Sequence, residues 1–309
     1  MARRKKKAPL WLAVIIIIIC SALYPFINGG ELDTAGGREV DAVDGAMELH
    51  IIDVGQADAI LIRSEAGNIL VDAGDRDDDD TVKNYLEAHG VKEIEYAVFT
   101  HPHADHIGGA DTVISSFDIK NIIMPEVAEA HIPTSAVYSD MISAIEKKED
   151  INVIVAEAGA EYSVGEVKMK ILGPNYTKKY SELNDYSIVV RVDFGSTSFM
   201  LTGDAEAVND GEMLEKYPAS EFKCTFYKAA HHGAKESNSE EFLKAVSPEI
   251  IAISCGADNK YGHPHAEAMN RFEDTGATIY RTDLDGSLVF ARWRAPDADP
   301  DDARPRDRH

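Results

Sequence analysis

Along residues 46–126, apolar positions form short runs separated by turn residues, the pattern of strands alternating with helices. Polar and apolar residues alternate over 47–64 on both sides of Gly55, which predicts two strands joined by a short loop. Residues 67–75 and 94–100 predict two further strands, each followed by a turn. The other elements expected in this half are helices at 79–90 and 110–117 and a strand at 120–126.

The second half of the chain has a similar order of strand-rich segments and helices. Strands are predicted within 151–159, 161–174, 186–206 and 225–233, and a closing strand at 287–293. Helices are predicted within 209–218, 239–248 and 265–276. Two strand-rich halves with helices outside predict two packed sheets covered by helices on both faces, an α+β fold.

The N-terminal segment 1–28 has the pattern of a membrane anchor. Five basic residues, 3–7, precede an apolar run over 10–27, which is about 18 residues and long enough to span a bilayer. The basic cluster predicts a cytoplasmic N-terminus, a single pass, and a catalytic domain outside the cell membrane. A cleaved signal peptide followed by secretion is the alternative, although no clear A-x-A site follows the run.

Two segments flank the expected domain. Residues 29–45 are rich in Gly and Asp without apolar periodicity and predict a linker. Residues 295–309 are rich in Pro and charge and predict a disordered acidic tail. One domain remains, covering about 46–294.

Charge changes the range of functions that we expect. The 309 residues include 54 acidic and 31 basic side chains, a formal net charge of -23. This balance argues against tight, indiscriminate nucleic-acid binding, although a local basic groove is compatible with it. An acidic surface also keeps a secreted protein soluble. Cys224 and Cys255 either form a disulfide or remain as two buried thiols.

The motif HPHADH at 101–106 concentrates ligand chemistry at the end of a predicted strand. Alternate residues of an extended segment point the same way, so His101 and His103 can bind one ion. Asp105 and His106, past the bend, can face a second ion. Imidazole with carboxylate favours zinc, manganese or iron over calcium. The alternative is a cluster of surface histidines without a resident ion.

Three later segments add candidate ligands. Asp204 follows a strand, where a carboxylate can bridge two ions, although many aspartates there are helix caps. His231 and His232 are adjacent, so one of them is expected to bind metal while the other faces substrate or packs. His263 and His265 precede a helix and favour contact with substrate over metal binding.

Together these motifs resemble the metallo-β-lactamase superfamily. Within it, the combination of DVGQADAILI, HPHADH, LTGD, HHG and NKYGHPH over about 47–291 resembles the hydrolase domain of ComEC-type competence proteins. The resemblance implies a four-layer αββα sandwich and two divalent ions, zinc or manganese. It assigns His101 and His103 to one ion, Asp105 and His106 to the other, and Asp204 to both.

The resemblance also implies roles for the remaining positions. His231 or His232 would complete the second site, with His231 preferred as the ligand. Asp53 and Asp72 match early acidic positions, and Asp72 would orient a ligating histidine. His265 would contact substrate or support the site. Many relatives supply another histidine before the bridging aspartate, whereas residues 132–230 contain none. We therefore expect a more open first ion, and occupancy by a single ion stays compatible with the sequence.

The implied activity is hydrolysis by a water shared between two ions, with Asp105 orienting that water and His232 or His263 donating a proton. The first hypothesis is an extracytoplasmic phosphodiesterase that acts on DNA. The second is a hydrolase of cell-envelope phosphoesters, such as a phosphorylcholine esterase of teichoic acids. The third is a metal-dependent binding module without catalysis. A chain with one predicted span cannot form a channel, and the sequence identifies no protein partner.

Overall fold

The structure is a computed structural model that describes residues 46–76, 79–178 and 180–293. The predicted anchor at 1–28, the linker at 29–45 and the tail at 295–309 lie outside these residues. No helix in the described ranges is both long and apolar enough to cross a membrane.

The first sheet has seven strands in the order β14-β1-β2-β3-β4-β5-β6 among the described residues. Strands β3 to β6 pair in parallel, whereas β1 pairs antiparallel with β2 and β14. The bounds are β1 Ala46–Ile51, β2 Ile60–Ser64, β3 Gly67–Val71, β4 Glu93–Val98, β5 Asp118–Met124, β6 Asn152–Val155 and β14 Leu288–Trp293.

The second sheet also has seven strands within the described part of the chain, in the order β13-β12-β11-β10-β9-β8-β7. Strands β10 to β13 pair in parallel, and β7 to β10 pair antiparallel. The bounds are β7 Glu161–Val164, β8 Val167–Gly173, β9 Val189–Phe194, β10 Thr197–Leu201, β11 Phe226–Lys228, β12 Ile250–Ile253 and β13 Thr278–Arg281.

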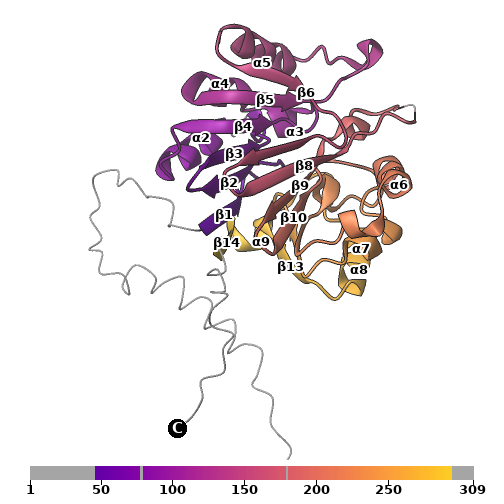
Figure 1. Ribbon diagram of the computed structural model, residues 1–309. Coiled ribbons are helices and arrows are strands. Elements are labelled where there is room, and N and C mark those ends of the chain that lie inside the picture. The colour runs from indigo at the N-terminus through magenta and orange to yellow at the C-terminus, as the bar shows by residue number, and fades with distance from the viewer. Residues whose placement is uncertain (1–45, 77–78, 179, 294–309) are drawn as a thin grey trace, which may run out of the picture. The chain divides into compact units, whose positions relative to one another are not determined.

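Helices form two groups, one beside each sheet, as Figure 1 shows. The first group is α2 Asp79–Ala88, α3 Ala104–Ile107, α4 Ala110–Ser116 and α5 Ala136–Glu146, and the second is α6 Ala207–Lys216, α7 Glu240–Val246 and α8 Ala266–Asp274. Shorter elements are η2 Glu129–His131, η3 Leu183–Tyr186, η4 Ala219–Glu221, η5 Ala230–Gly233 and α9 Thr282–Asp285.

The alternation of apolar residues explains why the layers form. In β2, Ile60 and Ile62 point into the core between the two sheets, while Leu61 points into the core under α2, α4 and α5. In β12, Ala252 faces the core between the sheets, and Ile251 packs under the second group of helices. Three cores between four layers confirm the predicted αββα sandwich.

The longer elements α5, β12 and β13 and the short helices α3 and α9 were not predicted from the sequence. The signal for α5 is present in the sequence, because Ser135 caps its first turn and Met141 and Ala144 are buried at helical spacing. Cys224 and Cys255 are free and buried, so the thiol alternative is correct and the disulfide is not formed.

Candidate metal centre

The residues with ligand chemistry come from loops that follow parallel strands. Asp72 follows β3, the HPHADH loop follows β4, Asp204 follows β10, and His231 with His232 follows β11. Strands β3 and β4 pair in parallel in one sheet, and β10 and β11 in the other. Carboxyl ends of parallel strands meet at one edge, which is where ligands bind in such sheets.

Among the described residues, three groups of side chains could hold a metal ion. Within each group, the potential ligand atoms all lie within 4.8 Å of one another. The largest holds two carboxylates and two imidazoles, and a second adds the first two histidines of the motif. The groups are Asp105, His106, Asp204 and His232; His101, His103 and Asp204; and Asp58, Asp72 and His106.

Three buried atoms in the largest group fit a metal ion. His106 Nε2, Asp204 Oδ1 and His232 Nε2 have no hydrogen-bond partner within the described part of the chain. Buried polar atoms almost always have partners, because an unpaired one costs about 1–3 kcal/mol. Imidazole nitrogen and carboxylate oxygen are the donors that zinc and manganese accept. The residues therefore fit a divalent transition metal.

Asp204 lies at the middle of the cluster and is 1% exposed. Its Oδ1 is 3.1 Å from His106 Nε2 and 3.8 Å from His232 Nε2. Its Oδ2 is 3.8 Å from His101 Nε2 and 3.6 Å from His231 Nε2. A carboxylate with each oxygen facing different imidazoles could hold metal together with either pair of histidines.

Asp72 orients the motif from behind. It accepts hydrogen bonds from the backbone N and the Oγ1 of Thr100, at 2.8 and 2.7 Å, and from His106 Nδ1 at 2.7 Å. These bonds leave His106 Nε2 directed at Asp204. Gly203 permits the approach of its loop, since a Cβ there would lie 2.8 Å from Thr100 Oγ1. The expected orienting role of Asp72 agrees with this geometry.

Burial and charge work against each other in the cluster. Burial alone would lower the pKa of His106, but the carboxylates of Asp204 and Asp72 raise it well above its ordinary value. Burial would raise the pKa of Asp204, and His106 and His232 instead hold it well below its ordinary value. Burial and the charge of His106 lower the pKa of His101. Asp204 is thus a carboxylate and His101 is neutral at pH 7, whereas His106 carries a proton that metal binding would displace.

The adjacent pair His231 and His232 differs from the preferred prediction. His232 is 1% exposed and belongs to the group with Asp105 and His106, and its Nδ1 donates to the carbonyl oxygen of Ser254 at 3.0 Å. His231 lies outside that group and faces the other oxygen of Asp204. The geometry therefore favours His232 as the ligand beside Asp105, in place of His231.

The mouth of the site is aromatic. His263 stacks on His232 with ring centroids 6.1 Å apart, and Tyr261 stacks on His263 at 5.7 Å. Gln56 Nε2 lies 3.3 Å from His263 Nδ1. Burial and the neighbouring histidines lower the pKa of His263 to about 4. His263 is therefore neutral at pH 7, which suits hydrogen bonding to substrate better than transfer of a proton from an imidazolium.

Two other predicted positions lie in supporting turns. Asp53 is exposed and accepts a hydrogen bond from the backbone N of Gly55, and it belongs to none of the three ligand groups. His265 accepts from the backbone N of Lys235 at 3.1 Å and precedes α8. The structure thus places Asp53 in a turn and His265 in the scaffold of the loop.

The sequence reasoning missed a buried ion pair beneath the centre. Lys228 Nζ is 2.7 Å from Asp58 Oδ2, and both side chains are at most 2% exposed. The other oxygen of Asp58 lies 3.6 Å from His232 Nδ1, and its backbone N donates to Asp105 O. The pair joins the two sheets at the ligands. Asp58 precedes β2 and Lys228 ends β11, so no local motif connects them.

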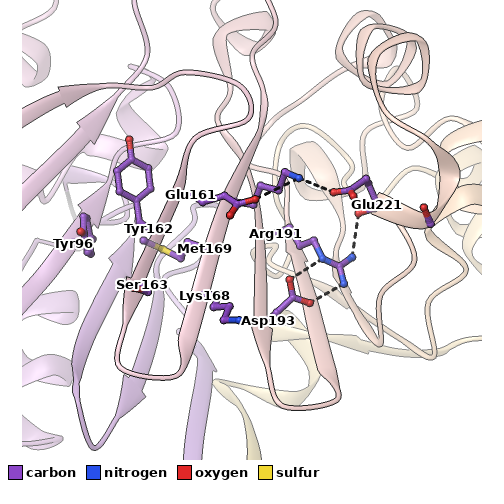
Figure 2. A pocket seen from close by; sticks show the side chains of 11 residues that line it. Tyr96, Glu161, Tyr162, Ser163, Lys168, Met169, Arg191, Asp193 and Glu221 are labelled. Carbon is purple, nitrogen blue, oxygen red and sulfur yellow. Dashed lines mark hydrogen bonds and ion pairs between the residues drawn. The ribbon is translucent and has the colours of Figure 1, made fainter.

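Two cavities bear on the choice of site. The one at the cluster is about 240 Å³ and is lined by Gln56, His103, Ala104, Asp105, Asp204, His231, His232, Tyr261 and His263. A larger one, about 710 Å³, lies over β7, β8 and β9 and contains no member of the cluster (Figure 2). There Arg191 pairs with Asp193 at 2.7 Å and Lys170 with Glu221 at 2.9 Å, so these charges satisfy each other. We therefore assign the chemistry to the smaller cavity.

Comparison with known proteins agrees with this geometry. Residues 52–256 match the description "Metallo-beta-lactamase superfamily". The chain belongs to the metallo-beta-lactamase superfamily. Solved structures show the same fold: CmlA, a diiron beta-hydroxylase of Streptomyces venezuelae, has a TM-score of 0.53 at 13% identity, over 79% of this chain and 54% of CmlA. The metallo-beta-lactamase fold protein YhfI of Bacillus subtilis has a TM-score of 0.50 at 13% identity, over 81% of this chain and 100% of YhfI.

Three curated relatives have names that denote competence or recombination. ComE operon protein 3 of Bacillus subtilis is 25% identical over 79% of this chain and 33% of its own length. Competence protein ComA of Neisseria gonorrhoeae is 28% identical over 92% of this chain and 39% of its own length. Recombination protein 2 of Haemophilus influenzae is 28% identical, over 78% and 28%. The chain spans about a third of these relatives, and the predicted resemblance is confirmed at this distance.

Proposed function

We propose that this metallo-beta-lactamase-fold chain is a metal-dependent phosphodiesterase with two divalent ions, and that its substrate is DNA. The observation that supports the metal dependence is a cluster of three buried atoms that make no hydrogen bond within the described residues: Asp204 Oδ1, and His106 Nε2 and His232 Nε2, which lie within 3.8 Å of it. Two ions, when bound, lower the pKa of a shared water so that it is a nucleophile near neutral pH. His101, His103 and Asp204 would hold one ion; Asp105, His106, His232 and Asp204 would hold the other.

The residues of the chain then divide the remaining work. Asp105 lies 3.4 Å from His232 Nε2 and is partly exposed to the cavity, so it is placed to orient the attacking water as well as to bind metal. His263 and Gln56 line the same cavity and can hydrogen bond to a non-bridging phosphate oxygen. Tyr261, 54% exposed at the mouth, offers an apolar face to the leaving portion of the substrate.

The names of the relatives support DNA as the substrate, because they denote competence and recombination. The net charge of -23 supports a smaller or envelope-bound phosphoester, including a phosphorylcholine ester of teichoic acid. We favour DNA, because three of the relatives share this association. We further propose that the domain acts outside the cell membrane, held by residues 10–27, and protease treatment of intact cells tests that location.

The activity is tested with the purified chain and bis(p-nitrophenyl) phosphate in Mn²⁺ or Zn²⁺. Chelation should abolish turnover, and Asp204→Asn should lower it by at least about 100-fold, since metal sites depend on their ligands. Asp53→Asn is the matched control, the same chemical change in an exposed turn, and should leave turnover intact. A fully metallated chain that cleaves no phosphoester would refute the proposal and favour a binding module. Release of nucleotides from single-stranded DNA against release of choline from cell walls then separates the two substrates.

A further inference from the structure

The two halves of the metal centre differ in their number of ligands. Asp105, His106, His232 and Asp204 make four around the second ion, whereas His101, His103 and Asp204 make three around the first. The sequence supplies no histidine over 132–230 to complete the first half. His231 belongs to none of the three groups of ligand atoms, but its Nε2 lies 3.6 Å from Asp204 Oδ2, the oxygen that also faces His101.

The oxygens of Asp204 face two matched pairs of imidazoles. Oδ1 has His106 at 3.1 Å and His232 at 3.8 Å. Oδ2 has His101 at 3.8 Å and His231 at 3.6 Å. Each pair combines one histidine of the HPHADH loop with one of the HHG loop. Donor atoms sharing a tetrahedral zinc ion at about 2.1 Å lie roughly 3.4 Å apart, so separations of 3.6–3.8 Å fit a shared ion and exceed a hydrogen bond.

The backbone conformation of the HHG loop explains how the adjacent residues His231 and His232 can face different halves of the metal centre. His231 has φ 50° and His232 has φ 52°, so both are left-handed. This conformation costs a non-glycine residue about 1–2 kcal/mol and rarely occurs twice in succession. It turns the two rings to opposite oxygens of Asp204, with centroids 6.2 Å apart. The loop thus retains strain at the position where two ligands must diverge.

The second nitrogen of His231 is also held. Its Nδ1 lies 3.4 Å from Glu206 Oε1, and Asn184 Nδ2 donates to the same oxygen at 2.9 Å. A ligating histidine normally has its other ring nitrogen held by a carboxylate or carbonyl. His232 Nδ1 is held in the same manner by the carbonyl of Ser254. The two adjacent histidines are therefore oriented alike, each with Nε2 toward Asp204.

We propose that His231 is the fourth protein ligand of the first metal ion, with Glu206 as the residue that positions it. This inference rests on the proposed function in requiring that the cluster binds metal. The sequence predicts a more open first site. With His231 as a ligand, each of the two ions has four protein ligands. HHG then supplies one ligand to each ion.

Titration of the apo full chain with Co²⁺, followed by absorption and calorimetry, tests the proposal without an activity assay. The wild type should bind two ions. His231→Ala should remove the same spectral component as His101→Ala, while His232→Ala removes the other. In His231→Ala, the affinity of the first site for Co²⁺ should fall by more than the roughly 10–100-fold that follows removal of a residue hydrogen bonded to a ligand. In Glu206→Gln, the affinity of that site should fall by an amount within this range. His263→Ala, whose ring lies 5.4 Å from His231, is the matched control and should keep both sites.

The outcomes separate the inference from the proposed function. If the wild type binds no ion, both fail. If the wild type and His231→Ala bind two ions with equal affinity, His231 is not a ligand and only the inference fails. Circular dichroism checks that His231→Ala folds, and His231→Gln and Glu206→Gln repeat the titration with milder changes. Unchanged first-site affinity in His231→Gln would overturn the inference in the same way, and unchanged affinity in Glu206→Gln would remove Glu206 as the positioning residue.

Discussion

Replacement of Lys228 by Met should be among the most destabilising single changes in the chain. The Lys228 side chain is 0% exposed, and its ammonium lies 2.7 Å from Asp58 Oδ2 and 2.9 Å from the carbonyl oxygen of Ala229. Removing one partner of a buried pair leaves the other charge without compensation, which costs about 3–5 kcal/mol. Lys228→Met should therefore lower the free energy of unfolding by that amount.

The predicted loss in the free energy of unfolding comes from the Asp58 carboxylate, which Lys228→Met leaves buried without a partner. Neutralising that carboxylate should therefore restore stability. The double variant Lys228→Met with Asp58→Asn removes both charges of this pair, and it should recover at least about 2 kcal/mol relative to Lys228→Met alone. Lys244→Met removes an exposed lysine that pairs with Glu240 on the same helix, and its urea midpoint should not change.

Urea unfolding of the purified chain in chelator, followed by circular dichroism, measures these differences without a contribution from bound metal. A loss below about 1 kcal/mol for Lys228→Met would refute the account of a dry, buried pair. So would a double variant no more stable than the single one. Because Asp58 contacts the segment of Asp105 and lies beside His232, Lys228→Met should also weaken binding at the second ion.

Three further predictions address activity, metal and pH. His103→Ala should abolish phosphoester cleavage while the melting temperature of the apo protein stays near wild type; unchanged rates would remove His103 from the site. Adding Zn²⁺ at about 100 times its dissociation constant should stabilise the chain by about 2.7 kcal/mol per site, seen as a rise in melting temperature. Burial raises the pKa of Asp210 from 3.8 to about 6, so its contribution to stability is full below pH 4 and is lost as pH rises through 6. Between pH 4 and 7, the free energy of unfolding of Asp210→Asn should therefore fall by up to about 3 kcal/mol less than that of the wild type. Urea unfolding measures both, and the same pH dependence in the two proteins would contradict the prediction.

The sequence supports the fold prediction because strand and helix periods are local. The alternation that sends Ile60 and Ile62 one way and Leu61 the other is visible in the chain itself. The candidate ligands of HPHADH could be predicted for the same reason, since they fall within six residues. Asp72 followed from the resemblance, which the structure supports with three hydrogen bonds.

The rest depends on contacts that no local pattern encodes. Lys228 and Asp58 lie 170 positions apart and meet only when the two sheets pack. The roles of His231 and His232 depend on two successive left-handed residues, a conformation that no local sequence pattern predicts. Asp53 is a candidate because it matches an early acidic position of the family, yet its carboxylate accepts a hydrogen bond from Gly55 N in an exposed turn after β1.

Anomalous diffraction from crystals of the chain grown with Mn²⁺ or Zn²⁺ tests the central claim most directly. The account predicts two peaks about 3.5–4 Å apart, one beside each carboxylate oxygen of Asp204. One peak should lie among Asp105, His106 and His232, and the other beside His101 and His103. Crystals with no anomalous peak at Asp204, or with ions bound only elsewhere, would contradict it.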